Sequence, residues 1–116
     1  MLNQVILVGR LTRDVVVNKS EKGIKVSTIN LAVPRSFKNS EGNYDTDFID
    51  CVAFDAIAEN TSGYCSKGDI VGVKGRVQSR IIEKNGINEN TMEIIAEKVT
   101  FLSSHTKEEE KSKATD

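Results

Sequence analysis

Three of the four phenylalanines in the chain lie close together in a segment that is otherwise polar. Phe37, Phe48 and Phe54 fall within residues 36–54, SFKNSEGNYDTDFIDCVAF, among Asp, Asn, Ser and Glu side chains. Rings on a water-facing surface can stack on the flat faces of unpaired nucleic-acid bases, and each stack is worth about 1–3 kcal/mol. The alternative is that each ring points into a hydrophobic core.

The alternation of residue types along 45–54 favours the first interpretation. Successive side chains of a strand point to opposite faces, so one face of this run carries Asp50 between Phe48 and Phe54. Burying an unpaired carboxylate is costly, so we expect this face to be wet. The two rings are six residues apart, on the order of 20 Å, and each would meet a different nucleotide. The predicted core face is Ile49, Cys51 and Ala53.

A basic stripe is predicted on a later strand, where Lys74, Arg76, Gln78 and Arg80 share one face. Lys and Arg on a sheet face can follow the phosphates of a single strand. The same pattern also occurs as a solvated face whose charges protect a sheet edge. Beside exposed aromatic rings, the phosphate interpretation is favoured. The predicted core face of this strand is Val71, Val73, Gly75, Val77, Ser79 and Ile81.

The elements that must position these residues are mostly strands. Hydrophobic periodicity predicts strands at 4–13, 24–35, 45–54, 69–82 and 91–102. The pattern breaks at 55–67, where we predict one short helix that begins at Asp55, a residue suited to an N-cap, and stops at Gly68. Asn85-Gly86 predicts a tight antiparallel hairpin between the last two strands. Three strands, a helix and two strands is the order of the OB-fold, a five-stranded Greek-key barrel, here with an extended β-hairpin.

Composition bounds the function classes. The chain has 116 residues, 38% apolar and 28% charged, with a net charge of −1, which fits one globular domain and gives no overall attraction to nucleic acid. No apolar run is long enough to span a bilayer and no signal peptide is recognised, so we expect a cytoplasmic protein without a membrane partner. Cys51 and Cys65 are expected to be free buried thiols. We expect an OB domain at 1–103 and a short disordered polar tail at 104–116.

The sequence argues against an enzyme. The sole histidine, His105, lies in the predicted tail, and neither cysteine has a histidine near it in sequence. No metal-ligand spacing occurs and no Gly-rich phosphate loop opens a helix, so we expect no catalytic residue, no metal and no cofactor.

Several motifs together resemble the bacterial single-stranded DNA-binding proteins, in the form found in low-GC Gram-positive bacteria and their phages. They are MLNQVILVGRLTRD at the start, LAVPRSF at 31–37, DFIDCVAF with AEN at 47–60, KGDIVGVKGRVQSR at 67–80 and MEIIAEKVTFL at 92–102. The resemblance covers residues 1–102. It implies an OB-fold, a homotetramer (a dimer being the alternative), and sequence-independent binding of single-stranded DNA in replication, recombination and repair, in the bacterial cytoplasm or nucleoid. It also implies base stacking by Phe37, Phe48 and Phe54.

The chain departs from the family pattern at three places. Ile82 stands where relatives carry Trp or Tyr, which removes one stacking ring. Asp50 stands where relatives often have a neutral or basic group, and it should repel phosphate unless a cation neutralises it. After Glu108, Glu109 and Glu110 there is no apolar tail tip of the kind that recruits replication enzymes in the family, so tail-mediated recruitment is not expected.

The hypothesis from the sequence is therefore a self-associating binder of single-stranded DNA. Two alternatives stay open: an OB-fold adaptor of the primosome type, whose rings and basic groups meet a protein partner, and a binder of single-stranded RNA. Phe101, on an apolar final strand, is assigned to the core or to an oligomer contact. The predicted phosphate contacts are Arg10, Arg35, Lys67, Lys74, Arg76 and Arg80.

Overall fold

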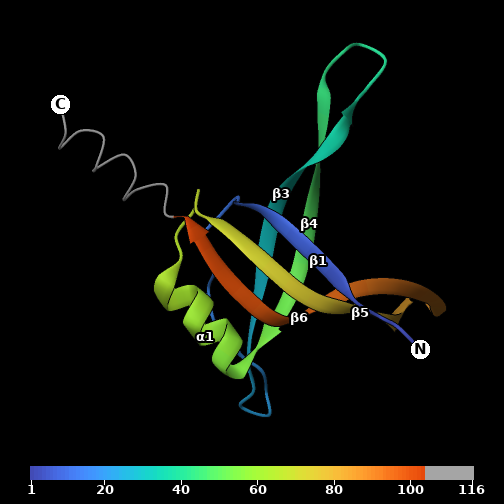
Figure 1. The fold of residues 1–116 in the computed structure, drawn as a ribbon. Coiled ribbons are helices and arrows are strands. Elements are labelled where there is room, and N and C mark those ends of the chain that lie inside the picture. Colours follow the sequence, from blue (N-terminus) through green and yellow to red (C-terminus); the bar gives the residue numbers. More distant parts are fainter. Residues whose placement is uncertain (104–116) are drawn as a thin grey trace.

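Residues 1–103 form a small β-barrel with two protruding hairpins and one helix in the computed structural model (Figure 1). The predicted tail 104–116, with His105 and the three glutamates, lies outside the described residues. The elements are β1 (Val5–Leu11), β2 (Asn18–Lys19), β3 (Lys25–Lys38), β4 (Tyr44–Phe54), α1 (Asp55–Tyr64), β5 (Ile70–Lys84) and β6 (Ile87–Ser103). Apart from the two-residue strand β2, which periodicity cannot detect, these are the predicted elements in the predicted order.

The five long strands close on themselves. The sheet runs β1-β5-β6-β4-β3, and a further pairing of β1 with β3 completes the circle. That closing contact consists of two residue pairs, Arg10 with Ala32 and Leu11 with Leu31. The parallel pairing of β4 with β6 also consists of two residue pairs. The predicted five-stranded barrel is thus confirmed, and its closure leaves few unpaired strand edges.

Side chains on the inner face of the barrel form the core, with the parity that the sequence predicts. Cys51, Ala53 and Val71 are fully buried, Val73 is nearly so, and Ile49 packs against them. Both cysteines are free and buried, and burial raises the pKa of each thiol to about 11. The other large side chains of the core are Leu11, Ile29 and Leu31.

The helix α1 contacts β3, β4 and β6 and is shorter than predicted. It ends at Tyr64, and Gly68 (φ +96°) instead belongs to the turn before β5. The cap position falls on Phe54, with no side-chain capping bond, while Asp55 is already the first helical residue at φ +49°. The predicted N-cap at Asp55 is wrong because the helix follows β4 directly and begins at Asp55 itself, so the extended cap position falls on Phe54, the last residue of β4.

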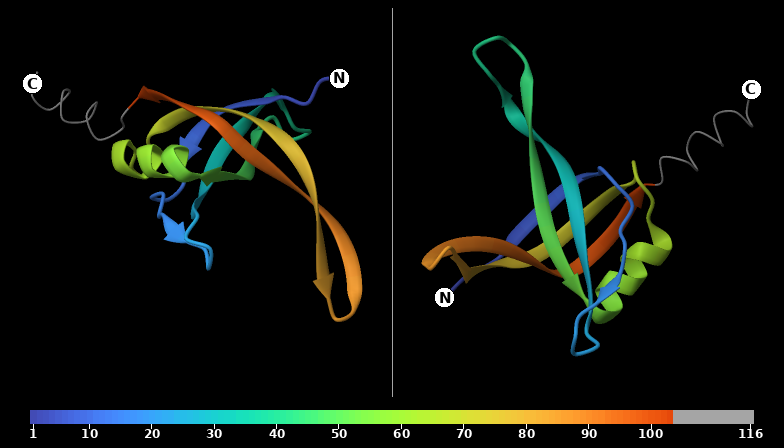
Figure 2. Two further views of the ribbon diagram at one scale, coloured as in Figure 1. Left: turned by 90° about the horizontal axis from the view of Figure 1, so that it is seen from below. Right: turned by 180° about the vertical axis from the view of Figure 1, so that it is seen from behind.

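Two hairpins extend β3–β4 and β5–β6 beyond the barrel, in different directions (Figure 2). The predicted Asn85-Gly86 turn is confirmed: both residues have positive φ, 52° and 77°, and Lys84 pairs with Ile87. Ser79 and Ile81 were predicted on the core face, yet both are exposed, Ile81 at 71%. The parity is right, but at these positions the strand has left the barrel and no core remains beneath them.

No helix within residues 1–103 is long and apolar enough to cross a bilayer. Over the same residues, no cluster of three His, Cys, Asp or Glu side chains is arranged to hold a metal ion.

The pairing of β5 with β6 contains a β-bulge: Lys74 pairs with Lys98, whereas the next residue, Gly75, pairs with Ala96. The extra residue on β6 bends the strand around the barrel and brings backbone close to Gly75. A Cβ atom at Gly75 would lie 2.1 Å from the Ile95 carbonyl oxygen, a separation that real Cβ atoms do not show. Position 75 therefore requires glycine for space.

We expect Gly75→Ala to lower the free energy of unfolding by about 1–3 kcal/mol, because the methyl group collides with backbone. Gly72→Ala is the matched control, since its Cβ would meet nothing closer than 3.6 Å; its effect should stay within about 0.5 kcal/mol. Urea unfolding followed by far-UV circular dichroism, at one protein concentration, measures both. Equal effects of the two substitutions would contradict the crowding at Gly75.

Candidate nucleic-acid interface

The outer face of β4 presents the predicted rings to solvent. Phe48 is 69% exposed and Phe54 is 40% exposed, whereas their neighbours Cys51 and Ala53 are fully buried. The prediction that this face of the strand is wet is confirmed.

A row of three residues crosses from β4 to β1 beside the first ring. Phe48 pairs with Ala32 on β3, and Ala32 pairs with Arg10 on β1. Directly paired residues of antiparallel strands share a face, so Arg10 and Phe48 lie on the same side with only a small alanine between them. The Arg10 guanidinium donates a 2.7 Å hydrogen bond to the Gly68 carbonyl. That bond brings the loop carrying Lys67, a second predicted phosphate contact, next to Arg10.

On the other side of β4, a second row leads to Arg76. Val52 pairs with Ile95 on β6, and Ile95 pairs with Arg76 on β5. Val52 lies two residues before Phe54 on the same face. The aromatic strand is therefore flanked by arginines on both sides, Arg10 across β3 and Arg76 across β6.

Asp50, between the two rings, has two partners on neighbouring segments. Its Oδ1 accepts a 2.6 Å hydrogen bond from Asn30 Nδ2 and lies 3.5 Å from a guanidinium nitrogen of Arg13. The Thr12 hydroxyl in turn bonds the side-chain oxygen of Asn30. The Asp50 carboxylate is thus paired with a cation, which reduces its repulsion of phosphate.

Arg76 and Arg80 stand at the base of the β5–β6 hairpin in a polar network. Arg76 donates a 2.6 Å bond to the Gln78 side-chain oxygen, and Gln78 donates a 3.0 Å bond to Glu93. Arg80 lies 3.9 Å from the same carboxylate. Ile82, two residues on, is 37% exposed on this face and offers an apolar surface.

Lys74 lies apart from the rings. It pairs with Ile6 on β1 and with Lys98 on β6, so two lysines and an exposed apolar side chain share the outer face of these three strands. This separates Lys74 from the row that contains Phe48.

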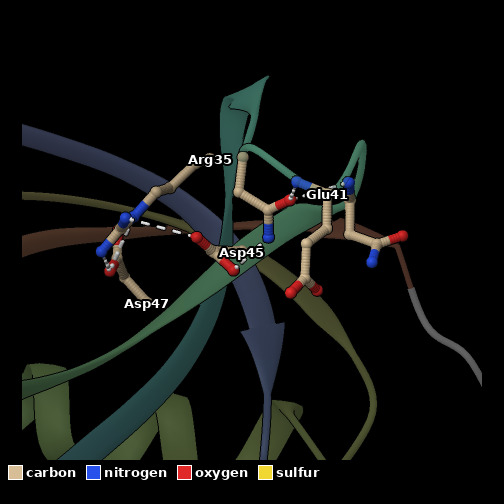
Figure 3. Close-up of polar contacts among 6 residues, drawn as sticks. Arg35, Glu41, Asp45 and Asp47 are labelled. Carbon is tan, nitrogen blue, oxygen red and sulfur yellow. Dashed lines mark hydrogen bonds and ion pairs between the residues drawn. The ribbon is translucent and has the colours of Figure 1, made fainter.

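Phe37 and Arg35 lie where the β3–β4 hairpin leaves the barrel. Phe37 is 64% exposed. Arg35 is held by two carboxylates of β4: three hydrogen bonds of 2.9–3.2 Å join it to Asp47, and Asp45 lies 3.6 Å away (Figure 3). The bond to Asp47 and the charge of both aspartates raise the pKa of Arg35, and the bond from Arg35 lowers the pKa of Asp47.

Sequence reasoning missed two residues of this surface. Arg13 was overlooked because its approach to Asp50 is a tertiary contact. Tyr44, 57% exposed with the Lys38 ammonium group 5.9 Å from its ring centroid, has the same signal as the phenylalanines, an aromatic residue in a polar segment. Of the two roles predicted for Phe101, the core is excluded within one chain, because the side chain is 45% exposed and its ring centroid lies 5.7 Å from that of Tyr64. The oligomer contact stays a prediction.

Comparison with known proteins places this surface in context. Residues 2–102 match the Single-strand binding protein family. The chain is 45% identical over 103 residues to single-stranded DNA-binding protein B of Bacillus subtilis, covering 88% of this chain and 91% of that protein. It is also 45% identical to single-stranded DNA-binding protein 1 of Staphylococcus aureus strain COL, covering 88% of this chain but 62% of that protein. The chain thus spans less than two thirds of the longer relative.

A solved structure agrees in fold. A deletion mutant of the single-stranded DNA binding protein from Thermus aquaticus superposes with a TM-score of 0.74 at 26% identity. The match covers 90% of this chain and 52% of that one.

Because the Phe48 ring is exposed, its removal should leave the stability of the fold nearly unchanged. Phe48→Ala should change the free energy of unfolding by no more than about 0.5 kcal/mol, because the ring contributes little to the core. Leu31→Ala, at a fully buried position in the neighbouring strand, should cost about 2–5 kcal/mol. Urea titrations of both variants measure the difference. A loss of the unfolding transition in Phe48→Ala would show that the ring is structural.

Proposed function

The chain belongs to the single-strand binding protein family, and from this premise we propose that it binds and protects single-stranded DNA without sequence preference, in replication, recombination and repair. The observation that carries the proposal is the outer face of β4, where two solvent-facing rings are flanked through the strand register by Arg10 and Arg76. Exposing aromatic rings to water is unfavourable in the free protein. Unpaired bases have flat faces that can stack on such rings and cover them.

In this proposal Phe37, Phe48 and Phe54 stack on bases, while cations follow the backbone. Every base has an apolar face, so stacking gives affinity without sequence preference. Each phosphate neutralised by a cation releases counterions, which makes binding sensitive to salt. Arg35 is not among these cations because its guanidinium is already held by two aspartates. The proposed phosphate contacts are Arg10, Lys67, Arg76 and Arg80. Lys74 pairs with Ile6 on the face that we assign to self-association, so it is not among them.

The proposal describes a binder without catalytic groups, in line with the names of its relatives. We place it in the bacterial cytoplasm, where single-stranded DNA forms as duplexes are opened. No observation favours the protein-adaptor or RNA alternatives over single-stranded DNA, and the first experiment separates all three.

Self-association is part of the proposal, and β1 supplies a surface for it. From Val5 to Gly9 this strand pairs with β5 on one side, whereas its pairing with β3 is confined to Arg10 and Leu11. Its outward side chains Ile6 and Val8 are 68% and 52% exposed. An open edge with exposed apolar side chains is suited to a second copy of the same chain. We propose a homotetramer in which this surface is covered.

The first experiment is fluorescence anisotropy of labelled oligo-dT, with duplex DNA and RNA of equal length as competitors. We expect tight binding of dT that the duplex does not displace, and the RNA competitor establishes which single strand is preferred. Phe48→Ala and Phe54→Ala should each weaken binding by about 1–3 kcal/mol through the lost stack. Tyr64→Ala, which removes an exposed ring from α1, is the matched control and should bind normally.

The salt dependence of the same titrations tests the phosphate contacts. Arg76→Ala should reduce the slope of log affinity against log salt by about 0.7, the contribution of one phosphate on a single strand. If dT does not bind even at low salt, the rings serve a protein partner and the adaptor hypothesis replaces this one.

The oligomer is tested separately from DNA binding. Val8→Glu should shift the chain to a smaller assembly in sedimentation velocity, because it places a charge in the covered surface. Val16→Glu is the control: Val16 is also exposed, at 63%, but lies off β1. Identical assemblies for both variants and the unchanged chain would exclude the outer face of β1 as the interface.

A further inference from the structure

The β3–β4 hairpin has a gap in its hydrogen-bond ladder at the point where it leaves the barrel. Pro34 pairs with Thr46 and the next pair is Lys38 with Tyr44, so four steps along β3 match two along β4. Pro34 has no N–H to donate, which suits the start of such an irregularity. The residues without a ladder partner, 35–37, include Phe37. Something other than backbone pairing must therefore fix the direction of this part of the hairpin.

Arg35 bridges the gap with its side chain. Its Nε and one terminal nitrogen bond both carboxylate oxygens of Asp47, and the other terminal nitrogen lies 3.6 Å from Asp45. Asp47 precedes the gap on the barrel side, where it pairs with Val33, and Asp45 lies opposite the gap. A guanidinium is a rigid planar fork, so two carboxylates fix its position more closely than one would.

The network continues from Asp45 into the hairpin loop. Asn39 donates a 3.1 Å hydrogen bond from its side chain to Asp45 Oδ1. The Asn39 side-chain oxygen accepts bonds from the backbone N–H groups of Glu41 and Asn43, at 2.9 and 3.0 Å. A continuous set of polar contacts therefore runs from the loop, through Asp45 and Arg35, to Asp47 (Figure 3).

We propose that Arg35 is a positioning residue, which holds the Phe37 segment of the hairpin through Asp47 and Asp45 and makes no contact with phosphate. This inference rests on the proposed function, because it assigns a role in presenting Phe37 to a base. The charge of the cluster supports it: one guanidinium faces two aspartates, and the cluster has a net charge of −1. A phosphate approaching Arg35 meets two carboxylates, one of which already accepts hydrogen bonds from Nε and one terminal nitrogen of the guanidinium.

The two possible roles of Arg35 predict opposite effects of removing its partner. If Arg35 contacted phosphate, Asp47→Asn would release the guanidinium, remove a negative charge and tighten binding. If Arg35 positions Phe37 through Asp47, the same substitution loosens the hairpin and weakens binding a few-fold. Asp47→Asn is therefore more decisive than any substitution of Arg35, which weakens binding in either case.

The experiment is oligo-dT anisotropy on the full chain, comparing the unchanged protein with single, double and exchanged variants. Arg35→Gln and Asp47→Asn should each weaken binding a few-fold, together no more than either alone, and neither should alter the salt slope. In a Phe37→Ala background, Asp47→Asn should have no further effect. The exchanged pair, Arg35→Asp with Asp47→Arg, should recover most of the affinity. Glu59→Gln, which removes an exposed carboxylate paired with Lys25 near the other end of β3, controls for net charge.

Amide hydrogen exchange gives an independent readout. Residues 36–43 should exchange faster in Asp47→Asn than in the unchanged chain, with the barrel strands unaffected. Tighter binding by Asp47→Asn, a salt slope lowered in Arg35→Gln, or unchanged exchange at 36–43 would each overturn the inference while leaving single-strand binding in place. Failure of the unchanged chain to bind dT would overturn the proposed function, and this inference with it.

Discussion

The structure depends on one constraint, the two-residue alternation of side chains along β4 within a barrel of only five long strands. A barrel this narrow accepts small residues on the inner face of β4, and Cys51 and Ala53 are fully buried there. The intervening residues are then fixed on the outside, whatever their polarity. Phe48 and Phe54 are exposed because a one-residue slip would put both rings, with Asp50, into a space that cannot hold them.

The positive charges of this surface are local and are not part of a net positive charge of the chain. With a net charge of −1 the chain offers little long-range attraction to a polyanion, and several of its arginines are already engaged by carboxylates. Arg13 with Asp50 and Arg80 with Glu93 are exposed pairs of the kind that contribute little to folding. Their effect is on the electrostatic field at the surface, because each carboxylate lowers the positive potential around the arginine beside it.

The fold and the face of the rings could be predicted from the sequence because both rest on local patterns. Alternation identifies the outer face of β4, and Asn85-Gly86 identifies the hairpin turn without any knowledge of the tertiary structure. What could not be predicted depends on where a strand leaves the barrel or which strand lies opposite. Ile81 has core parity but no core beneath it. Arg13 follows β1, and its contact with Asp50 of β4 appears only once the intervening strand β3 pairs with β4 and lies beside the segment after β1.

The buried cysteines have a consequence for how this molecule can be studied. A buried thiol with a pKa near 11 is largely protected from alkylation while the fold around it is intact. Cys51 lies between β3 and β6 in the barrel wall, whereas Cys65 follows the last residue of α1. The two sulfur atoms are therefore native chemical reporters of different events. Modification of Cys51 records opening of the barrel wall, and modification of Cys65 records detachment of the helix end.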